Sequence, residues 1–176
     1  MSELIDLIPA VKTDYPTLYN LARFYSYDIS EFFGDEPGWE MEDDGLYGVG
    51  VNYEQYFENE NAFPFLVRYK GELAGFAIVD KNSIDPSADF NMAQFFILRI
   101  YKRKGFGKQA AFQCFEKFIG SWEVDVMPKN KTAYHFWRSI IDEFTLNNFS
   151  EKIIRNKNDE ERITFRFSTD AEFHIT

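Results

Sequence analysis

A basic loop between an apolar segment and an amphipathic segment is the part of this sequence best suited to chemistry. The loop runs from Lys102 to Lys108, contains two glycines, and follows the apolar run Phe95–Leu98. Glycines allow successive backbone N–H groups to converge on an anion, and a helix start adds unpaired N–H donors and the positive end of the helix dipole. The stretch therefore predicts a phosphate-binding loop between a strand and a helix.

The distribution of charge along the chain favours an anion site in this region. Residues 1–98 contain 5 Lys and Arg against 18 Asp and Glu, residues 99–131 contain 8 against 3, and residues 132–176 contain 6 against 8. A positive segment in an acidic chain favours an anionic ligand, although chance clustering on a solvated helix face is the alternative. The net charge of −10 argues against a nucleic-acid-binding protein of the basic type.

Length and composition predict a single α/β domain over residues 1–176. The 45% hydrophobic content excludes a disordered chain, and the 20 phenylalanines indicate a bulky core. The single cysteine, Cys114, excludes an internal disulfide and is typical of a reducing compartment. We find no signal peptide at the N-terminus and no apolar run near the roughly 20 residues that span a bilayer. We therefore expect a cytoplasmic protein with no membrane segment.

Hydrophobic periodicity predicts the elements that must position the loop. In chain order they are a strand (Glu3–Ile8), a helix capped by Thr13 or Asp14, a short second helix (Ser30–Phe33), a hairpin (Phe65–Tyr69 and Leu73–Val79), a central strand (Asn91–Arg99), a helix burying Ala111, Cys114 and Phe115, a strand (Trp122–Val126), a helix after Asn130, and two final strands (Phe149–Ile154 and Ile163–Phe167). On this pattern Cys114 is a core residue rather than a nucleophile.

Residues 35–61 form an acidic, glycine-interrupted stretch without clear periodicity. We interpret it as a solvated loop; the alternative is a lid that faces the substrate and whose carboxylates attract an amine. The acidic cluster Glu40–Asp44 lacks the ligand spacing of a calcium loop, so no metal site is expected.

The order of these elements and two motifs resemble the GNAT superfamily of acyl-CoA-dependent N-acyltransferases over nearly the whole chain. The cofactor motif of that family is Gln or Arg, two residues, Gly, one residue, and Gly or Ala; this chain has Lys102–Gly107. The second motif is Asn, two residues, Ala, two residues, an apolar residue and an aromatic one; this chain has Asn130–Trp137. The resemblance implies a GNAT-like fold, with a central mixed, mostly antiparallel sheet flanked by helices.

The resemblance also implies a site for acetyl-CoA, used as a cosubstrate without a metal. The pyrophosphate would lie on the basic loop, and the pantetheine arm would run along the central strand, splayed from its neighbour by a bulge. Asn130 would contact the arm, cap the following helix, or do both. The implied cofactor-binding residues are Ile97, Leu98, Lys102, Arg103, Lys104, Gly105, Phe106, Gly107, Lys108, Asn130 and Phe136.

Chemistry in this family is direct attack of an amine on the thioester, with an acid protonating the leaving thiolate. This sequence departs from the pattern twice. The strand position that is often a glutamate base is Gln94, and the aromatic that is often a tyrosine acid is Trp137. Tyr134 is the replacement candidate for the acid; the alternative is a solvated or core tyrosine. Asp28 or Glu31 is the candidate for the base, unless the substrate arrives already neutral and needs none. The catalytic candidates are therefore Gln94, in a positioning role, and Tyr134.

Two functional classes follow from the resemblance. One is an N-acetyltransferase that moves an acetyl or other acyl group from acetyl-CoA to a primary amine of a small molecule or a protein. The other is a catalytically degenerate acyl-CoA-binding or regulatory module. A third reading is an interaction domain whose loop binds another anion. The acceptor carries no recognisable code, and the final strands could pair two subunits in a homodimer.

Overall fold

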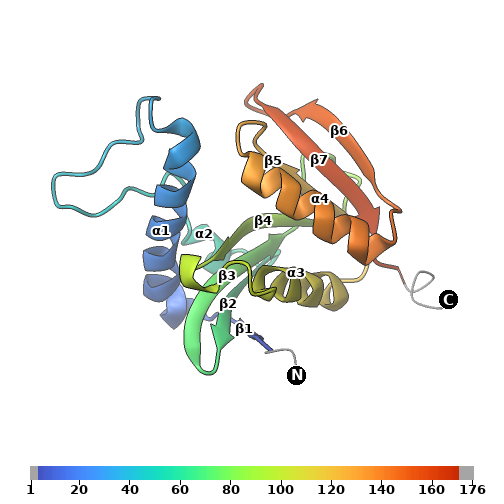
Figure 1. Cartoon of the computed structure of the whole chain (residues 1–176), viewed down its shortest axis with the longest axis horizontal. Coiled ribbons are helices and arrows are strands. Elements are labelled where there is room, and N and C mark those ends of the chain that lie inside the picture. Colours follow the sequence, from blue (N-terminus) through green and yellow to red (C-terminus); the bar gives the residue numbers. More distant parts are fainter. Residues whose placement is uncertain (1–3, 171–176) are drawn as a thin grey trace. The chain divides into compact units, whose positions relative to one another are not determined.

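The computed structural model describes residues 4–170, so Glu3, at the start of the first expected strand, lies outside the described residues. Within these residues, seven strands form one sheet in the order β1-β2-β3-β4-β5-β7-β6 (Figure 1). The strands are β1 (Asp6–Pro9), β2 (Ala62–Tyr69), β3 (Glu72–Asp80), β4 (Phe90–Ile97), β5 (Ser121–Val126), β6 (Ser150–Arg155) and β7 (Glu161–Ser168). The pairs β1–β2, β5–β7 and β6–β7 are antiparallel, and β4–β5 is parallel. The expected mixed sheet is therefore confirmed.

Helices occupy the connections between the strands. They are the 3₁₀ helices η1 (Lys12–Asp14) and η2 (Arg99–Tyr101) and the α-helices α1 (Tyr15–Phe33), α2 (Gln55–Glu58), α3 (Phe106–Lys117) and α4 (Lys131–Thr145).

The chain forms two compact units. One comprises the residues up to Ile78 together with Phe95–Gly107, and the other comprises Val79–Gln94 and the chain from Lys108 onward. The expectation that residues 1–176 form one domain stays a prediction, and each unit is described by itself below.

In the first unit, α1 is one continuous helix, which corrects the expected separate helix at Ser30–Phe33. No helix-breaking residue interrupts the sequence between Tyr25 and Ser30, and the Ser30 hydroxyl donates to the Tyr27 carbonyl at 2.6 Å instead of capping a new helix. A different short helix, α2, lies within the stretch expected to be a loop, and Tyr56 anchors it in the core. Leu18 and Ala22 on α1 are fully buried.

The predicted hairpin is present as β2 and β3. Its turn residues Lys70 and Gly71 have φ values of 51° and 83°, the left-handed conformations that a two-residue turn of this kind requires. At Gly75 in β3 a Cβ atom would lie 2.0 Å from the Phe96 carbonyl oxygen, so only glycine permits this approach of β3 and β4.

In the second unit, α4 lies across β5 and β7 (Figure 1). The core on this side of the sheet is aromatic: the Phe115 ring on α3 lies 5.0 Å from Trp122 on β5 and 4.9 Å from Phe167 on β7. Cys114 is fully buried beside this cluster, and burial raises the pKa of its thiol to about 12. Cys114 is thus a core residue, as predicted.

Candidate functional site

The basic loop has the backbone of an anion cradle. Arg103 and Gly105 have φ values of 62° and 79°, both in the left-handed region, and α3 begins directly afterwards at Phe106. A Cβ at Gly105 would meet no atom within 4 Å, so the backbone conformation, and not the space, calls for glycine there. The first N–H groups of α3 have no partner within the helix and lie at the positive end of its dipole.

Three aromatic rings hold the loop in the first unit. The Phe106 ring is 1% exposed and lies 4.7 Å from Tyr69 on β2 and 5.7 Å from Tyr101 in η2. The Tyr101 hydroxyl donates to Glu72 at 2.9 Å. These contacts fix both ends of the segment Lys102–Gly105, and its four residues are exposed to solvent.

Asp28 on α1 neutralises part of the positive charge of the loop region. Its two carboxylate oxygens accept from Arg99 and Lys102, each at 2.7 Å. Burial tends to raise the pKa of Asp28, but the hydrogen bonds and charges of Lys102 and Arg99 outweigh it and lower the pKa overall. A carboxylate stabilised in its charged form is a weak base, so this geometry argues against Asp28 as the proton acceptor.

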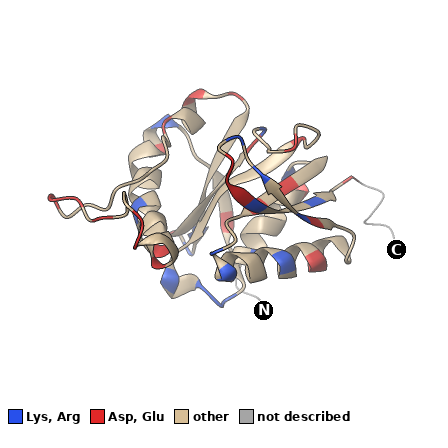
Figure 2. Cartoon of the chain, turned by 90° about the horizontal axis from the view of Figure 1, so that it is seen from above, with Lys and Arg blue, Asp and Glu red and all other residues tan. Residues whose placement is uncertain are grey.

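The acidic residues of the loop between α1 and α2, by contrast, lie on an extended and largely exposed path (Figure 2).

The end of β4 carries the two residues expected to bind the pantetheine arm. Ile97 is buried, and the Leu98 N–H donates to the Ala74 carbonyl at 2.8 Å while the Leu98 carbonyl accepts from Tyr101 at 2.9 Å. A hydrogen bond from the Leu98 N–H to a cofactor amide would therefore have to replace the one to Ala74. The arm contacts at these positions stay a prediction.

In the second unit, Asn130 caps α4. Its side-chain oxygen accepts from the Ala133 N–H at 2.9 Å, and its carbonyl accepts from Tyr134 at 3.0 Å. The capping role predicted for Asn130 is confirmed, whereas its contact with the cofactor stays a prediction. Lys108 at the start of the second unit forms an ion pair with Glu143 on α4, so its charge is shared with a carboxylate.

The aromatic residues of α4 divide between surface and core. The Tyr134 hydroxyl donates to Glu151 on β6 at 2.9 Å, and this hydrogen bond is the main reason that the pKa of Tyr134 is raised. Trp137 is buried and its ring lies 6.5 Å from Phe115, within the aromatic core. Phe136 is half-buried, with its ring 5.0 Å from Trp137. The residue at the usual tyrosine position is thus a core residue here.

The strand β4 carries Gln94, a half-buried residue of the second unit. The parallel strands β4 and β5 are paired at Phe90↔Trp122 and Asn91↔Glu123. Gln94 comes after these pairs along β4. The amide of Gln94 can orient a substrate or a water molecule, but it cannot take up a proton at neutral pH.

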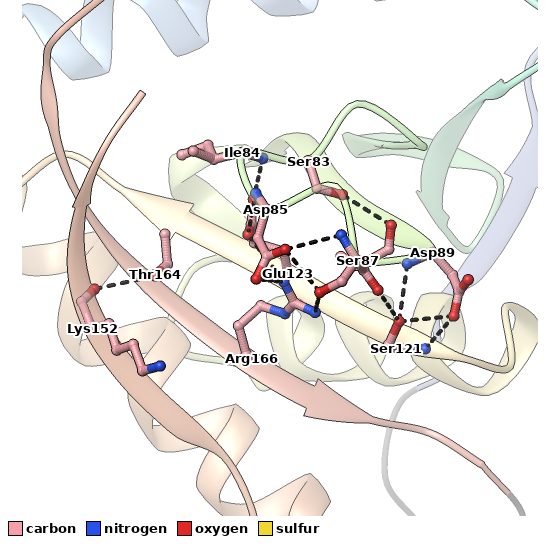
Figure 3. Close-up of polar contacts among 11 residues, drawn as sticks. Ser83, Ile84, Asp85, Ser87, Asp89, Ser121, Glu123, Lys152, Thr164 and Arg166 are labelled. Carbon is pink, nitrogen blue, oxygen red and sulfur yellow. Dashed lines mark hydrogen bonds and ion pairs between the residues drawn. The ribbon is translucent and has the colours of Figure 1, made fainter. Parts of the chain in front are cut away.

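A buried ionic network in the second unit was not predicted from the sequence (Figure 3). Glu123 on β5 is 0% exposed and accepts from the backbone N–H groups of Ile84 and Asp85. Arg166 on β7 lies 3.6 Å from Glu123 and 2.8 Å from the Asp85 carboxylate. Charged and apolar residues alternate in β5, and this pattern is a sequence signal for a buried ionic network. The same pattern is equally typical of a strand with one solvated face.

Neither a metal-ion cluster nor a membrane-spanning helix is present among residues 4–170. No group of three or more His, Cys, Asp and Glu residues within 4–170 is arranged to hold a metal ion. No helix in the same range is long and apolar enough to cross a membrane.

Comparison with known proteins identifies the family. Residues 16–140 match the model of the acetyltransferase (GNAT) family. The chain therefore belongs to the GNAT acetyltransferase family. A search of curated proteins gave no match.

Solved structures show the same fold at low sequence identity. A GNAT-family acetyltransferase from Streptococcus agalactiae superposes with a TM-score of 0.67 at 15% identity, over 93% of this chain and 95% of that one. An aminoglycoside acetyltransferase in complex with coenzyme A gives 0.61 at 14% identity, over 94% and 95%. The ribosomal-protein-S18-alanine N-acetyltransferase of Escherichia coli gives 0.58 at 16% identity, over 98% and 99%.

Proposed function

We propose that the chain transfers an acetyl group from acetyl-CoA to a primary amine by direct attack, without a covalent enzyme intermediate. The observation that carries the proposal is the exposed loop before α3, in which Arg103 and Gly105 adopt left-handed backbone conformations. Such a loop, followed by a helix start, suits the pyrophosphate of coenzyme A. Arg103 and Lys104, whose side chains are exposed, supply the positive charge.

The family and the names of two structural neighbours support an amine acceptor. One neighbour is named for the alanine of a ribosomal protein and another for aminoglycosides, which carry amino groups. In the proposed reaction the neutral amine attacks the thioester carbonyl, a C–N bond forms and the C–S bond breaks. The excess proton on nitrogen passes to the leaving thiolate, so coenzyme A departs as the free thiol.

A binding module without turnover is the second candidate, and two observations favour it. Gln94 stands where the family often has a titrating glutamate, and Trp137 stands where it often has a tyrosine and is buried against Phe115. A chain of this kind would bind acetyl-CoA and leave it intact.

Binding of coenzyme A is the first measurement, by the shift in melting temperature of the purified protein. A ligand that binds only the folded state stabilises it by about 2.7 kcal/mol at a free concentration 100 times its Kd. The matched controls are dephospho-coenzyme A, which keeps the pyrophosphate, and free pantetheine, which lacks it. A shift with coenzyme A and none with pantetheine is expected, whereas equal shifts would contradict a pyrophosphate site.

Release of free thiol from acetyl-CoA over a panel of amines then separates the two candidates. Cys114 is buried and burial raises its pKa to about 12, so its thiol gives little background in such an assay. Thiol release that depends on the amine, with an acetylated product seen by mass spectrometry, is expected. Binding of acetyl-CoA without thiol release over polyamines, aminoglycosides and peptide amines would favour the module.

A further inference from the structure

The strand β6 of the second unit forms one edge of the sheet (Figure 1). It pairs with β7 on one side, and within residues 4–170 no strand pairs with its other side. The pairing runs residue by residue from Ser150↔Arg166 to Arg155↔Glu161 without a bulge, and β6 contains no proline. An edge strand of this kind presents a row of backbone N–H and C=O groups that can pair with a further strand.

The hydrogen bonds at the end of β6 show which of its residues face outward. The Asn156 N–H donates to the Glu160 carbonyl at 3.0 Å, so Asn156 turns its backbone toward β7. Because bonded and non-bonded pairs alternate along an antiparallel ladder, every second residue back along β6 also faces β7. The Lys152 carbonyl fits this pattern, since it accepts from the Thr164 hydroxyl at 3.1 Å. The residues between them, whose backbone groups point outward, are Glu151, Ile153 and Arg155.

The side chains of these three residues lie on the face of β6 that is turned toward α4. Glu151 accepts from the Tyr134 hydroxyl at 2.9 Å and pairs with Arg138 at 3.3 Å, and both partners are on α4. Ile153 shares this face by the alternation of side chains along a strand, but it is 69% exposed, so α4 leaves it uncovered. An exposed apolar side chain therefore stands between an acid and a base, Glu151 and Arg155, each two positions away.

We propose that β6 pairs with β6 of a second copy of this chain, antiparallel and with Ile153 opposite the same residue of that copy. In this register Glu151 of each copy lies opposite Arg155 of the other, so two ion pairs flank an apolar contact at the two-fold axis. The outward N–H and C=O groups of the two strands bond to each other, and the two sheets become continuous. This gives a definite form to the homodimer expected from the final strands, and it does not depend on acetyl transfer.

Other registers of the same two strands are less favourable. A shift by one residue sets outward-facing backbone groups against groups already bonded to β7, so the intermolecular hydrogen bonds are lost. A shift by two residues in one direction sets Lys152 opposite itself, which is destabilising. In the other direction only Ile153–Arg155 of β6 remain paired. The exposed ion pairs add little to affinity, but their complementarity selects one register.

The first test is the oligomeric state of the purified full chain, by sedimentation velocity from low to high micromolar concentration. The wild type is expected to dimerise. Ile153→Lys sets two like charges opposite each other at the axis and is expected to raise the dimer dissociation constant at least about tenfold. The matched control is Ile119→Lys, the same substitution at an isoleucine that follows α3 and is 55% exposed, and it should leave the dissociation constant unchanged.

A mixing experiment tests the register itself. Ile153→Glu should repel its own copy as Ile153→Lys does, but a mixture of the two variants sets opposite charges against each other at the axis. The mixture is expected to associate about tenfold more tightly than either variant with itself. A mixture that associates no more tightly would overturn this register. A monomeric wild type, or an Ile153→Lys variant that dimerises as the wild type does, would overturn the β6 interface.

Hydrogen exchange tests the backbone pairing. The amides of Glu151, Ile153 and Arg155 are expected to be protected in the wild-type dimer and to exchange rapidly in monomeric Ile153→Lys, while the amides of β7 stay protected in both. Dilution of the wild type gives the same comparison if the variant does not fold. Protection of the outward amides that is independent of protein concentration would mean that this edge is covered within one copy, and would overturn the proposal.

Discussion

The carboxylate of Asp28 on α1 lies 2.7 Å from the ammonium group of Lys102, although the two residues are 74 positions apart in the sequence. The same carboxylate holds Arg99 at 2.7 Å, so α1 is tied to both ends of the η2 segment. Lys102, which the sequence suggested for the anion site, and the nearby Arg99 are thus already paired within the first unit. The exposed charges of Arg103 and Lys104 remain for the phosphate groups.

Replacing Asp28 with Asn is expected to lower the free energy of unfolding at pH 7 by about 1 kcal/mol, because its partners are largely exposed. The pKa of Asp28 is lowered in the folded state, so its stabilising effect is fully present above the unfolded pKa of about 3.9. The effect is lost as the pH falls through the lower folded value, where Asp28 becomes protonated. Urea unfolding of both proteins between pH 2.5 and 7 measures this difference.

Asp35→Asn, an exposed carboxylate after α1, is the control and should change stability by less than about 0.5 kcal/mol. A stability difference between wild type and Asp28→Asn that persists at pH 2.5 would show that the ion pairs are not its cause.

Introducing a glutamate at Gly105 is expected to weaken coenzyme A binding at least tenfold. The new side chain strains a residue whose φ is 79°, and its negative charge lies where the pyrophosphate is expected. Isothermal titration with coenzyme A measures the loss. Gly107→Glu, on the first turn of α3, should act in the same direction through its charge.

Gly71→Glu is a closely matched control for this prediction. Gly71 has a φ of 83° in the β2–β3 turn, and a Cβ there meets no atom within 4 Å, as at Gly105. It therefore adds the same strain and the same charge in a turn outside the segment Lys102–Lys108, and coenzyme A affinity should be retained. Normal affinity in Gly105→Glu would remove the loop from the cofactor site.

Arg166→Leu is expected to destabilise the protein by about 3 kcal/mol. The substitution leaves the fully buried Glu123 without its nearest positive charge, at 3.6 Å, and also removes the ion pair with Asp85. Urea unfolding measures the change in free energy.

Arg138→Leu is the surface counterpart, since Arg138 pairs with Glu151 at 3.3 Å and is 48% exposed. It should cost less than about 1 kcal/mol. Equal losses of unfolding free energy in Arg166→Leu and Arg138→Leu would mean that the burial of Glu123 is not the cause of the destabilisation.

Gln94→Ala is expected to lower kcat/KM only modestly, less than about tenfold, because an amide positions a substrate but carries no proton. The shape of the pH profile should not change. Steady-state kinetics from pH 5 to 9 measure both properties. If Gln94→Ala instead changed the shape of the pH profile, Gln94 would be part of the proton path.

The sequence by itself determined the order of elements, the loop before α3 and the cap of α4. These are local properties: the turn at Gly71, the glycines of the loop and the cap at Asn130 depend on backbone conformations and hydrogen bonds within a few residues. The continuous helix α1 and the short helix α2 were the exceptions. A sequence without a helix-breaking residue lets helix α1 continue through Ser30, since each added residue gains a hydrogen bond without a new nucleation cost.

Only the tertiary structure decided which charges are paired and which are exposed. Lys102 pairs with Asp28, 74 positions away in the sequence. Glu123 is held by groups 38 to 43 positions away, the last of which is Arg166. Asp125 pairs with Arg162, 37 positions away. Sequence periodicity shows that a side chain shares a face with its neighbours in the same element. It does not show which strand or helix covers that face, and burial by that partner sets the pKa values on which the chemistry depends.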